Sequence, residues 1–203
     1  MTRVVLASAN PGKLRELAAL LAPLSLELIP QQQLGIASAV ETGSTFLDNA
    51  LLKARHAAQR AQLPALADDS GLEVSALDGR PGVQSARYAG ENASDSENLL
   101  LLLAQLKDVP DAQRQARYQC VIALVRTAAD AAPLIARGSW SGHIARKPRG
   151  AGGFGYDPVF VPHGEERSAA QLTAAEKNAV SHRGQALTAL VAMLEGSGYI
   201  RAP

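Results

Sequence analysis

The chain has 203 residues, of which 47% are hydrophobic and 19% are charged, and its formal net charge is +1 at pH 7. The apolar share is enough for a substantial core, whereas the near-neutral charge excludes the overall basic footprint of a nucleic-acid-binding protein. Cys120 is the single cysteine, which excludes an intramolecular disulfide and any multi-cysteine metal site. We expect a cytoplasmic protein without a membrane or nucleic-acid partner, because no targeting peptide or membrane-length apolar run is present.

Strands and helices alternate at the start of the chain. The apolar run 3–7 predicts a short buried strand, and after an Asn-Pro-Gly turn a helix begins near Lys13, with leucine and alanine at helical spacing. Residues 25–29 predict a second strand. The polar and irregular segment 31–43 predicts a loop before the next helix.

The next helix carries an unusual lysine. Thr45 can cap its first turn, with Asp48 three residues later, and the helical pattern continues to about Gln62. At about 100° per residue, Lys53 falls on a stripe of small and apolar side chains. A fully solvated lysine is not expected there, so Lys53 is a candidate functional residue.

The middle of the chain predicts a strand, a helix and a hairpin. Residues 65–67 predict a strand that enters an Asp-Asp pair, and an S-x-x-E capping box predicts a helix over 95–107. Residues 116–126 and 134–145 predict two long strands joined by a short turn. Cys120 lies in the apolar part of the first of these strands and is expected to be a buried core thiol.

The end of the chain predicts two helix starts. Thr173 opens a second capping-box pattern, and the final helix begins near Ser181 with its leucines on one face. Alternating strands and helices followed by a hairpin are typical of an α/β chain with a mixed sheet. No segment has the composition of a linker between separate domains.

The segment SANPGK, residues 8–13, joins the first strand to the first helix. Such a junction directs backbone N–H groups and the positive end of the helix dipole at one point, which suits a phosphate. Lys13 adds a full charge, and Ser8 and Asn10 add hydrogen-bonding groups. The segment is not a Walker A loop, because the first glycine and the Ser/Thr of that motif are missing. An ordinary turn with a solvated lysine is the alternative for this segment alone.

Asp68 and Asp69 are adjacent at the end of the predicted third strand. Neighbouring carboxylates repel one another unless a cation lies close to them. Mg²⁺ prefers oxygen ligands and normally keeps waters and substrate phosphates in its shell, and Glu41 in the polar loop can join the two aspartates. The alternative is a turn, because Asp-Ser-Gly is a common turn composition.

Two further segments have the residues of a nucleobase pocket. In GGFGYD, residues 152–157, the glycines permit a ligand to approach the backbone, Phe154 and Tyr156 can stack on a base, and Asp157 can accept from a ring N–H. SHRG, residues 181–184, places an imidazole and a guanidinium at a helix start, which favours a nearby anion or carbonyl. The alternatives are a glycine-rich hairpin turn with two core aromatics and an exposed first helical turn.

Six segments occur in one order along the chain: SANPGK, ETGSTFLDNALLKA, ALADDSGLEV, GRPGVQSARYAG, GGFGYDPVF and SHRGQAL. Together they closely resemble the non-standard purine nucleoside triphosphate pyrophosphatases, the inosine/xanthosine triphosphatase or RdgB-like family. The resemblance extends over residues 4–187. Each segment is weak by itself, but the ordered set is highly specific.

The resemblance implies a fold, an assembly and a reaction. The fold is a single α/β domain over residues 1–203, with a long mixed central sheet, flanking helices and two lobes around an active-site cleft. The assembly is a homodimer. The reaction is Mg²⁺-dependent hydrolysis of ITP, dITP and XTP to the monophosphate and pyrophosphate, which removes deaminated purines from the nucleotide pool.

The resemblance also assigns residues to roles. The catalytic residues are Asp69, as general base, and Lys53, which together with Ser70 also contacts the triphosphate. The metal ligands are Asp69, Asp68 and Glu41. The phosphate-binding loop comprises Ser8, Ala9, Asn10, Pro11, Gly12 and Lys13. The base pocket comprises Phe154, Gly155, Tyr156, Asp157, Lys177, His182 and Arg183.

The alternative function is a regulatory module that binds purine nucleotides without turnover. The acidic pair Asp68 and Asp69 favours the enzyme, because a pure binder gains little from carboxylates near phosphates. An RNA-binding domain is disfavoured by the near-neutral net charge.

Overall fold

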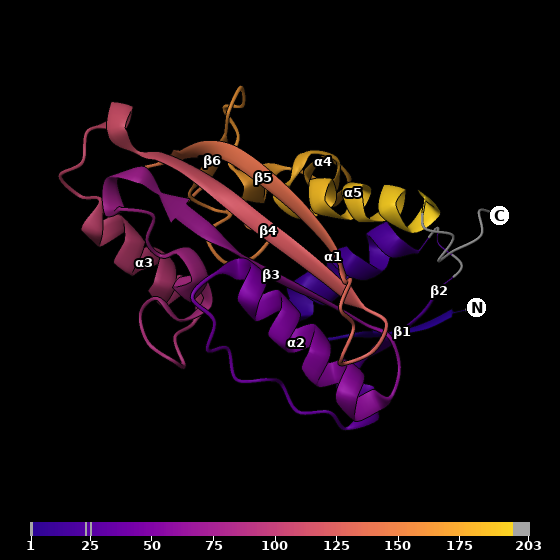
Figure 1. Cartoon of the computed structure of the whole chain (residues 1–203). Helices are drawn as coiled ribbons and strands as arrows, with labels where there is room; N and C mark the ends of the chain where they lie inside the picture. The colour runs from indigo at the N-terminus through magenta and orange to yellow at the C-terminus, as the bar shows by residue number, and fades with distance from the viewer. Residues whose placement is uncertain (1, 23, 25, 197–203) are drawn as a thin grey trace. The chain divides into compact units, whose positions relative to one another are not determined.

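A computed structural model describes residues 2–22, 24 and 26–196 of the chain. These residues form a six-stranded sheet in the order β2-β1-β3-β4-β5-β6. The strands are β1 Thr2–Leu6, β2 Leu26–Pro30, β3 Ala65–Val74, β4 Gln115–Val125, β5 Leu134–Ile144 and β6 Phe160–Pro162. β1 pairs in parallel with both β2 and β3, whereas β5 and β6 are antiparallel. The predicted mixed sheet is therefore confirmed (Figure 1).

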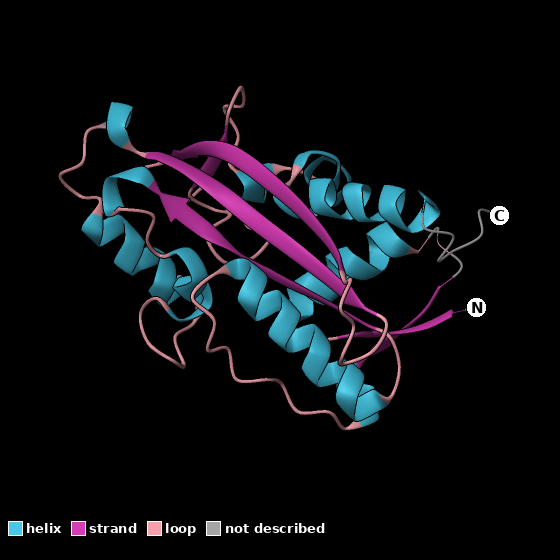
Figure 2. Cartoon of the chain, in the orientation of Figure 1, coloured by secondary structure: helices cyan, strands magenta, loops and turns pink. Residues whose placement is uncertain are grey.

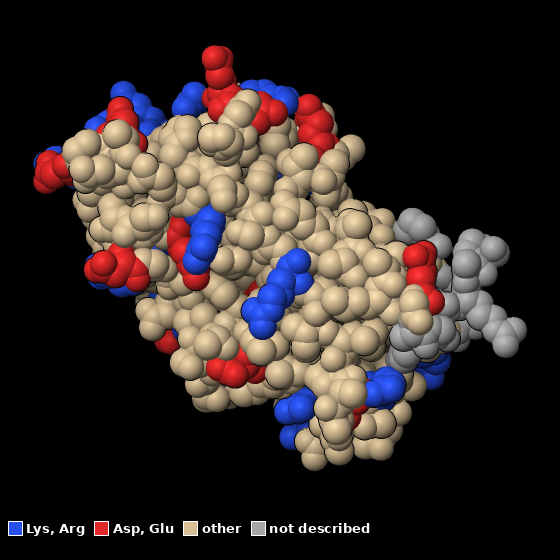
Figure 3. Space-filling view, turned by 45° about the horizontal axis from the view of Figure 1, so that its top comes forward, with Lys and Arg blue, Asp and Glu red and all other residues tan. Residues whose placement is uncertain are grey.

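Five α-helices accompany the sheet among the described residues (Figure 2). They are α1 Pro11–Leu21, α2 Phe46–Ala61, α3 Asp95–Gln105, α4 Ala174–Val180 and α5 His182–Gly196. No helix in this described part of the chain is both long and apolar enough to cross a membrane. On the face that Figure 3 shows, basic and acidic side chains are interspersed, which fits the net charge of +1.

The chain divides into two compact units. The first unit comprises residues 1–69, 120–138 and 183–203, and the second comprises residues 70–119 and 139–182. The boundaries fall within β3, β4 and β5 and after the first residue of α5. The single two-lobed domain expected from the sequence stays a prediction.

In the first unit, successive residues of each strand point to opposite faces of the sheet. Even-numbered residues such as Leu66 and Ile122 pack in one core cluster with the leucines of α1 and α5. Odd-numbered residues such as Ala67 and Ala123 pack in another cluster with the alanines of α2. The small side chains on the α2 side permit the helix to approach the strands closely. This alternation decides which helix each functional side chain of β3 meets.

The core of the second unit is more aromatic. It contains Tyr118 of β4, Trp140 of β5 and Phe160 of β6, together with leucines of α3 such as Leu102. The Tyr118 and Phe160 rings meet edge to face, with centroids 4.7 Å apart, an arrangement that aromatic quadrupoles favour. Tyr156 of the glycine-rich turn that precedes β6 belongs to the same cluster.

The predicted helix starts at Thr45, Ser94 and Thr173 are confirmed. The Thr45 side chain accepts from the Asp48 N–H at 3.1 Å, and the capping boxes at Ser94 and Thr173 are both formed. α1 begins at Pro11, before the predicted position near Lys13, because Asn10 caps it and proline suits the first helical position. The last helix begins at His182, next to the predicted Ser181.

Among the strands, β3 differs most from the bounds predicted from the sequence. The predicted strand 65–67 continues through both aspartates to Val74, because cationic side chains neutralise the carboxylates from each face of the sheet. The predicted strands 116–126 and 134–145 are confirmed within one residue at each end. The predicted strand 25–29 corresponds to β2, with Ser25 outside the described residues.

Cys120 is confirmed as a core thiol, with 1% of its surface exposed. Burial, with a further contribution from Asp68, raises the pKa of the Cys120 thiol to about 12. We therefore expect a disulfide reagent such as DTNB to modify the native protein at least about 100-fold more slowly than the urea-unfolded chain. The measurement is the rate of thionitrobenzoate release under both conditions. Rapid stoichiometric release in native buffer would contradict the buried position.

Candidate active site

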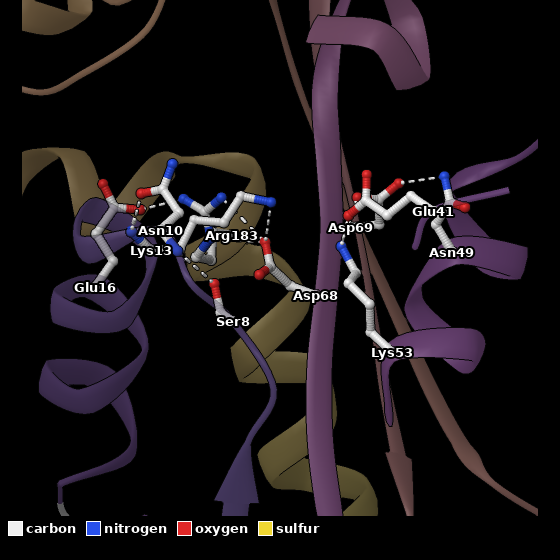
Figure 4. Close-up of polar contacts among 10 residues, drawn as sticks. All are labelled: Ser8, Asn10, Lys13, Glu16, Glu41, Asn49, Lys53, Asp68, Asp69 and Arg183. Carbon is white, nitrogen blue, oxygen red and sulfur yellow. Dashed lines mark hydrogen bonds and ion pairs between the residues drawn. The ribbon is translucent and has the colours of Figure 1, made fainter. Parts of the chain in front are cut away.

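Asp68 and Asp69 leave β3 in opposite directions (Figure 4). Asp68 continues the even-numbered set and points toward α1 and α5, and Asp69 continues the odd-numbered set and points toward α2. Both are buried, with 1% and 4% of their surface exposed. The two carboxylates therefore do not share one cation, as their adjacency in the sequence suggests, and each has its own set of partners.

Asp68 is held by two cations. Its Oδ2 lies 3.2 Å from Lys13 Nζ at the start of α1, and 3.2 Å from Nη2 of Arg183 at the start of α5. Arg183 also forms an ion pair with Glu16. Burial disfavours the charged form of Asp68, but Lys13 and Arg183 outweigh this cost and hold its pKa well below the usual range. Asp68 thus stays a carboxylate and fixes the starts of both helices.

Asp69 lies beside different charged residues, which belong to α2 and to the loop before it. Lys53 Nζ lies 2.8 Å from Asp69 Oδ1 and 2.7 Å from Glu41 Oε1. Burial raises the pKa of Asp69, and Lys53 opposes this shift. Burial acts in the other direction on Lys53, but Asp69, Asp68 and Glu41 together raise its pKa above the ordinary lysine value. The predicted catalytic pair Asp69 and Lys53 is therefore in direct contact, and Lys53 carries its charge.

Asn49 connects Asp69 to the loop that carries Glu41. Its Nδ2 donates to Asp69 Oδ2 at 3.3 Å, and its Oδ1 accepts from the Gly43 N–H at 2.8 Å. Asn49 is fully buried, one helical turn before Lys53 on the same face of α2. A Cβ atom at Gly43 would lie 2.6 Å from Asn49 Oδ1, so only glycine permits this close approach.

Asn49 and Glu16 were not among the site residues predicted from the sequence. The signal for Asn49 is its spacing of four residues from Lys53 on one helix, together with the cost of burying an amide without partners. Glu16 stands three residues after Lys13 on α1, but only the tertiary structure brings it to Arg183.

The predicted phosphate-binding loop lies on the Asp68 side of β3 (Figure 4). Asn10 Oδ1 accepts from the Lys13 N–H at 3.1 Å, and Ser8 Oγ accepts from the Asn10 N–H at 3.3 Å. Asn10 therefore acts as the helix cap. Ala9, Pro11 and Gly12 complete the turn into α1, and Lys13 adds a charge beside the positive end of the helix. The arrangement suits an anionic group, and phosphate binding by this loop stays a prediction.

Asp157 anchors the predicted base-pocket residues of the second unit. Its Oδ2 accepts from the Phe154 N–H at 2.9 Å and from Lys177 Nζ at 2.7 Å. Its Oδ1 lies 3.4 Å from the Tyr118 hydroxyl. Lys177 Nζ in turn lies 4.8 Å from the centroid of the Phe154 ring. Asp157 thus holds the glycine-rich turn and Lys177 together.

The other predicted base-pocket residues lie in both units. His182 stacks on Tyr118 with ring centroids 4.6 Å apart, and the Tyr156 hydroxyl donates to the Ser85 carbonyl at 2.9 Å. The Gly155 N–H donates to Asp95 at 2.7 Å. Arg183 belongs to the first unit, where it pairs with Asp68 and Glu16. Ser70 follows Asp69 on β3 at the first position of the second unit.

The predicted metal ligands are brought together only in part. Glu41 and Asp69 each place an oxygen against the same ammonium of Lys53, so their carboxylates converge on one cationic position. Two hard oxygen ligands fit Mg²⁺, which completes its shell with waters and phosphate oxygens. Asp68 faces away from this pair, and among residues 2–22, 24 and 26–196 no group of three His, Cys, Asp or Glu gathers as a metal site. Metal binding by Glu41, Asp69 and Asp68 stays a prediction.

Comparison with known proteins gives one consistent family. The family model described as the Ham1 family matches residues 4–193. A dITP/XTP pyrophosphatase of Shigella flexneri is 58% identical and covers 94% of this chain and 97% of its own. One of Photorhabdus laumondii is 56% identical, over 97% of this chain and 100% of its own.

Solved structures agree with this result. A HAM1 protein from Coxiella burnetii superposes with a TM-score of 0.89 at 52% identity, and covers 97% of this chain and 100% of its own. A nucleoside-triphosphatase / dITP/XTP pyrophosphatase from Mycobacterium abscessus gives a TM-score of 0.76 at 48% identity, over 94% of this chain and 99% of its own.

The close contact of Gly43 with Asn49 generates a stability prediction. Gly43→Ala should lower the free energy of unfolding by about 1–3 kcal/mol, because the new methyl group overlaps Asn49. Urea unfolding followed by circular dichroism measures this loss.

The matched control is Ser44→Ala, which changes the neighbouring exposed residue of the same loop and should leave stability within about 0.5 kcal/mol. In the double variant Gly43→Ala with Asn49→Ala, the two losses should be less than additive, since the overlap with Asn49 Oδ1 is removed while the overlap with Asp48 Cβ stays. Strict additivity would mean that the two residues do not contact.

Proposed function

This chain belongs to the Ham1 family, and on that premise we propose that it is a pyrophosphatase that hydrolyses the deaminated purine nucleotides dITP, ITP and XTP to the monophosphate and pyrophosphate. The proposal agrees with the family that the six ordered sequence segments predicted. It is supported by dITP/XTP pyrophosphatases that are more than 50% identical to this chain and match it over nearly their whole length. The observation that carries it is the juxtaposition of the buried Asp69 with the half-buried Lys53 and Glu41 in one charged cluster.

The substrate brings about four negative charges to the site, so cations dominate its binding. Lys13 lies at the positive end of α1, and Lys53 lies on the other side of β3. Both lysine side chains are mostly buried, with 15% and 13% of their surface exposed. Poorly hydrated and positioned in advance, they can stabilise charge that redistributes in the transition state.

Asp69 holds or orients the water that attacks the α-phosphorus. The bond between that phosphorus and the oxygen that bridges it to the β-phosphate breaks, and pyrophosphate leaves with the bridging oxygen. Its raised pKa makes Asp69 a better proton acceptor than an ordinary exposed carboxylate. The residues that would hold Mg²⁺ are Glu41 and Asp69, with Asp68 a further carboxylate across the strand; the ion would supply charge neutralisation at the phosphoryl oxygens. The hydrogen bond from Asn49 orients Asp69.

Base selection depends on hydrogen-bond matching. Inosine and xanthosine present a 6-oxo acceptor to donors such as His182 and backbone N–H groups, whereas adenosine presents a 6-amino donor. Each donor left unpaired costs about 1–3 kcal/mol, which disfavours adenosine. Phe154, held by Asp157 and flanked by Lys177, offers a ring on which the base can stack.

The proposed substrates belong to the soluble nucleotide pool, so we place the protein in the cytoplasm. We also propose that it is a homodimer and that its metal is Mg²⁺, as the sequence resemblance implies. Removal of deaminated purines there prevents their entry into nucleic acid. The rival hypothesis, a regulatory module that binds purine nucleotides without turnover, gives no reason for a buried carboxylate with a raised pKa beside a triphosphate-binding lysine.

The reaction itself is tested with a panel of nucleotides. With Mg²⁺ present, ITP, dITP and XTP should give pyrophosphate as the primary product, and ATP should be cleaved at least about 100-fold less efficiently because its 6-amino group opposes the donors. Separate assays of pyrophosphate and orthophosphate distinguish the products. Binding without turnover would support the regulatory module, and primary release of orthophosphate would indicate a different phosphatase.

Asp69→Asn tests the catalytic carboxylate. The amide keeps the shape and the contact with Asn49 but cannot accept a proton, so kcat for ITP should fall by about 10²–10⁴-fold with native circular dichroism. Asp78→Asn is the matched control, since Asp78 is exposed and has a positive φ of 53° that asparagine tolerates. Near-wild-type turnover of Asp69→Asn would remove Asp69 from catalysis.

A further inference from the structure

Lys53 bridges the two carboxylates that form the proposed metal pair. Its Nζ lies 2.7 Å from Glu41 Oε1 and 2.8 Å from Asp69 Oδ1, and both are charge-assisted hydrogen bonds of full strength. Only 13% of the lysine side chain is exposed, so water screens these contacts weakly. The ammonium thus occupies the position on which the two carboxylates converge (Figure 4).

A divalent cation cannot use the same oxygens while the ammonium stays. Mg²⁺ requires carboxylate oxygens at about 2.0–2.1 Å, which would place it within a few ångströms of Lys53 Nζ. Like charges at that separation repel strongly in a site that is mostly shielded from water. Either the ion is excluded or the ammonium moves away.

Asn49 holds the Asp69 carboxylate and the loop that carries Glu41, so both can keep their places when the ammonium leaves. Asn49 donates to Asp69 Oδ2 and also accepts from the Gly43 N–H, which fixes the loop two residues after Glu41. Asn49 is itself fully buried on α2. The lysine, in contrast, ends a flexible four-carbon chain that can swing by rotation about its own bonds.

We propose that Lys53 is a built-in cation that a divalent metal displaces from Glu41 and Asp69, and that the displaced ammonium becomes the partner of the substrate's phosphates. The inference rests on the proposed function, in that it takes Glu41 and Asp69 as the metal pair. It adds a sequence of binding events at that site: Lys53 neutralises the two carboxylates until the metal ion replaces it. Binding of the ion and release of the lysine are then one exchange, and the metal affinity of the protein alone is lowered by the cost of moving the ammonium.

Metal binding in the absence of nucleotide tests the exchange. Mn²⁺ is the probe, because electron paramagnetic resonance measures the free ion directly. Lys53→Met, which keeps the length of the side chain and removes its charge, should bind Mn²⁺ at least about tenfold more tightly than the unaltered protein. Lys13→Met is the matched control: it removes a lysine that pairs with Asp68 on the other face of β3, and it should change the affinity by less than about threefold. Equal gains in both variants would reduce the effect to general electrostatics and overturn the exchange.

A crystal structure of the unaltered protein with Mn²⁺ alone gives a second result that does not depend on the folding of any variant. Anomalous density between Glu41 and Asp69, with Lys53 Nζ withdrawn from at least one carboxylate, is expected. A metal bound to both carboxylates with both lysine contacts intact would refute the exchange and leave the metal pair standing. Metal bound elsewhere, with Lys53 unmoved, would refute the metal pair and the exchange together, whereas the nucleotide panel would still test the reaction.

Discussion

The alternation of side chains along β3 is the constraint on which the site depends. Because successive residues of a strand face opposite sides of the sheet, Asp68 and Asp69 are separated although they are neighbours in the chain. Asp68 is neutralised by cations at the starts of α1 and α5, and Asp69 by a lysine from the middle of α2. Neither carboxylate could be buried without these partners, since an unpaired buried charge is very costly.

The two sides of β3 consequently have different chemical characters. On the Asp68 side, Lys13 and Arg183 outweigh the effect of burial and keep the carboxylate ionised. The ion pairs of Asp68 with these two cations therefore stabilise the structure. On the Asp69 side, burial dominates and raises the pKa, and the neighbouring Glu41 adds to the shift. A carboxylate of the second kind is suited to proton transfer and to exchange of cations, and one of the first kind is suited to holding structure.

The second unit uses a similar device for a different purpose. Asp157 is buried, and its carboxylate binds the backbone of the glycine-rich turn and the ammonium of Lys177 at once. Gly153 has a φ of +71°, and a Cβ there would lie 2.1 Å from Asp157, so the turn needs glycine both for its backbone and for this contact. Asp157 accepts from the Phe154 N–H and from Lys177, and these contacts hold Phe154 in place; its expected role as an acceptor for a nucleobase stays a prediction.

The sequence was sufficient wherever a local rule applies. Caps at Thr45, Ser94 and Thr173, the apolar strands and the buried Cys120 all follow from side-chain chemistry within a few residues, and six ordered motifs identify the family. It was not sufficient where partners are far apart along the chain. The continuation of β3 through two aspartates, the opposite directions of Asp68 and Asp69, and the parts played by Asn49 and Glu16 depend on helices folded against the strand. Many charge pairings are possible in the unfolded chain, and long-range packing decides which of them form. The physical reason is that an unpaired charge or amide costs far more free energy when it is buried than when it is in water.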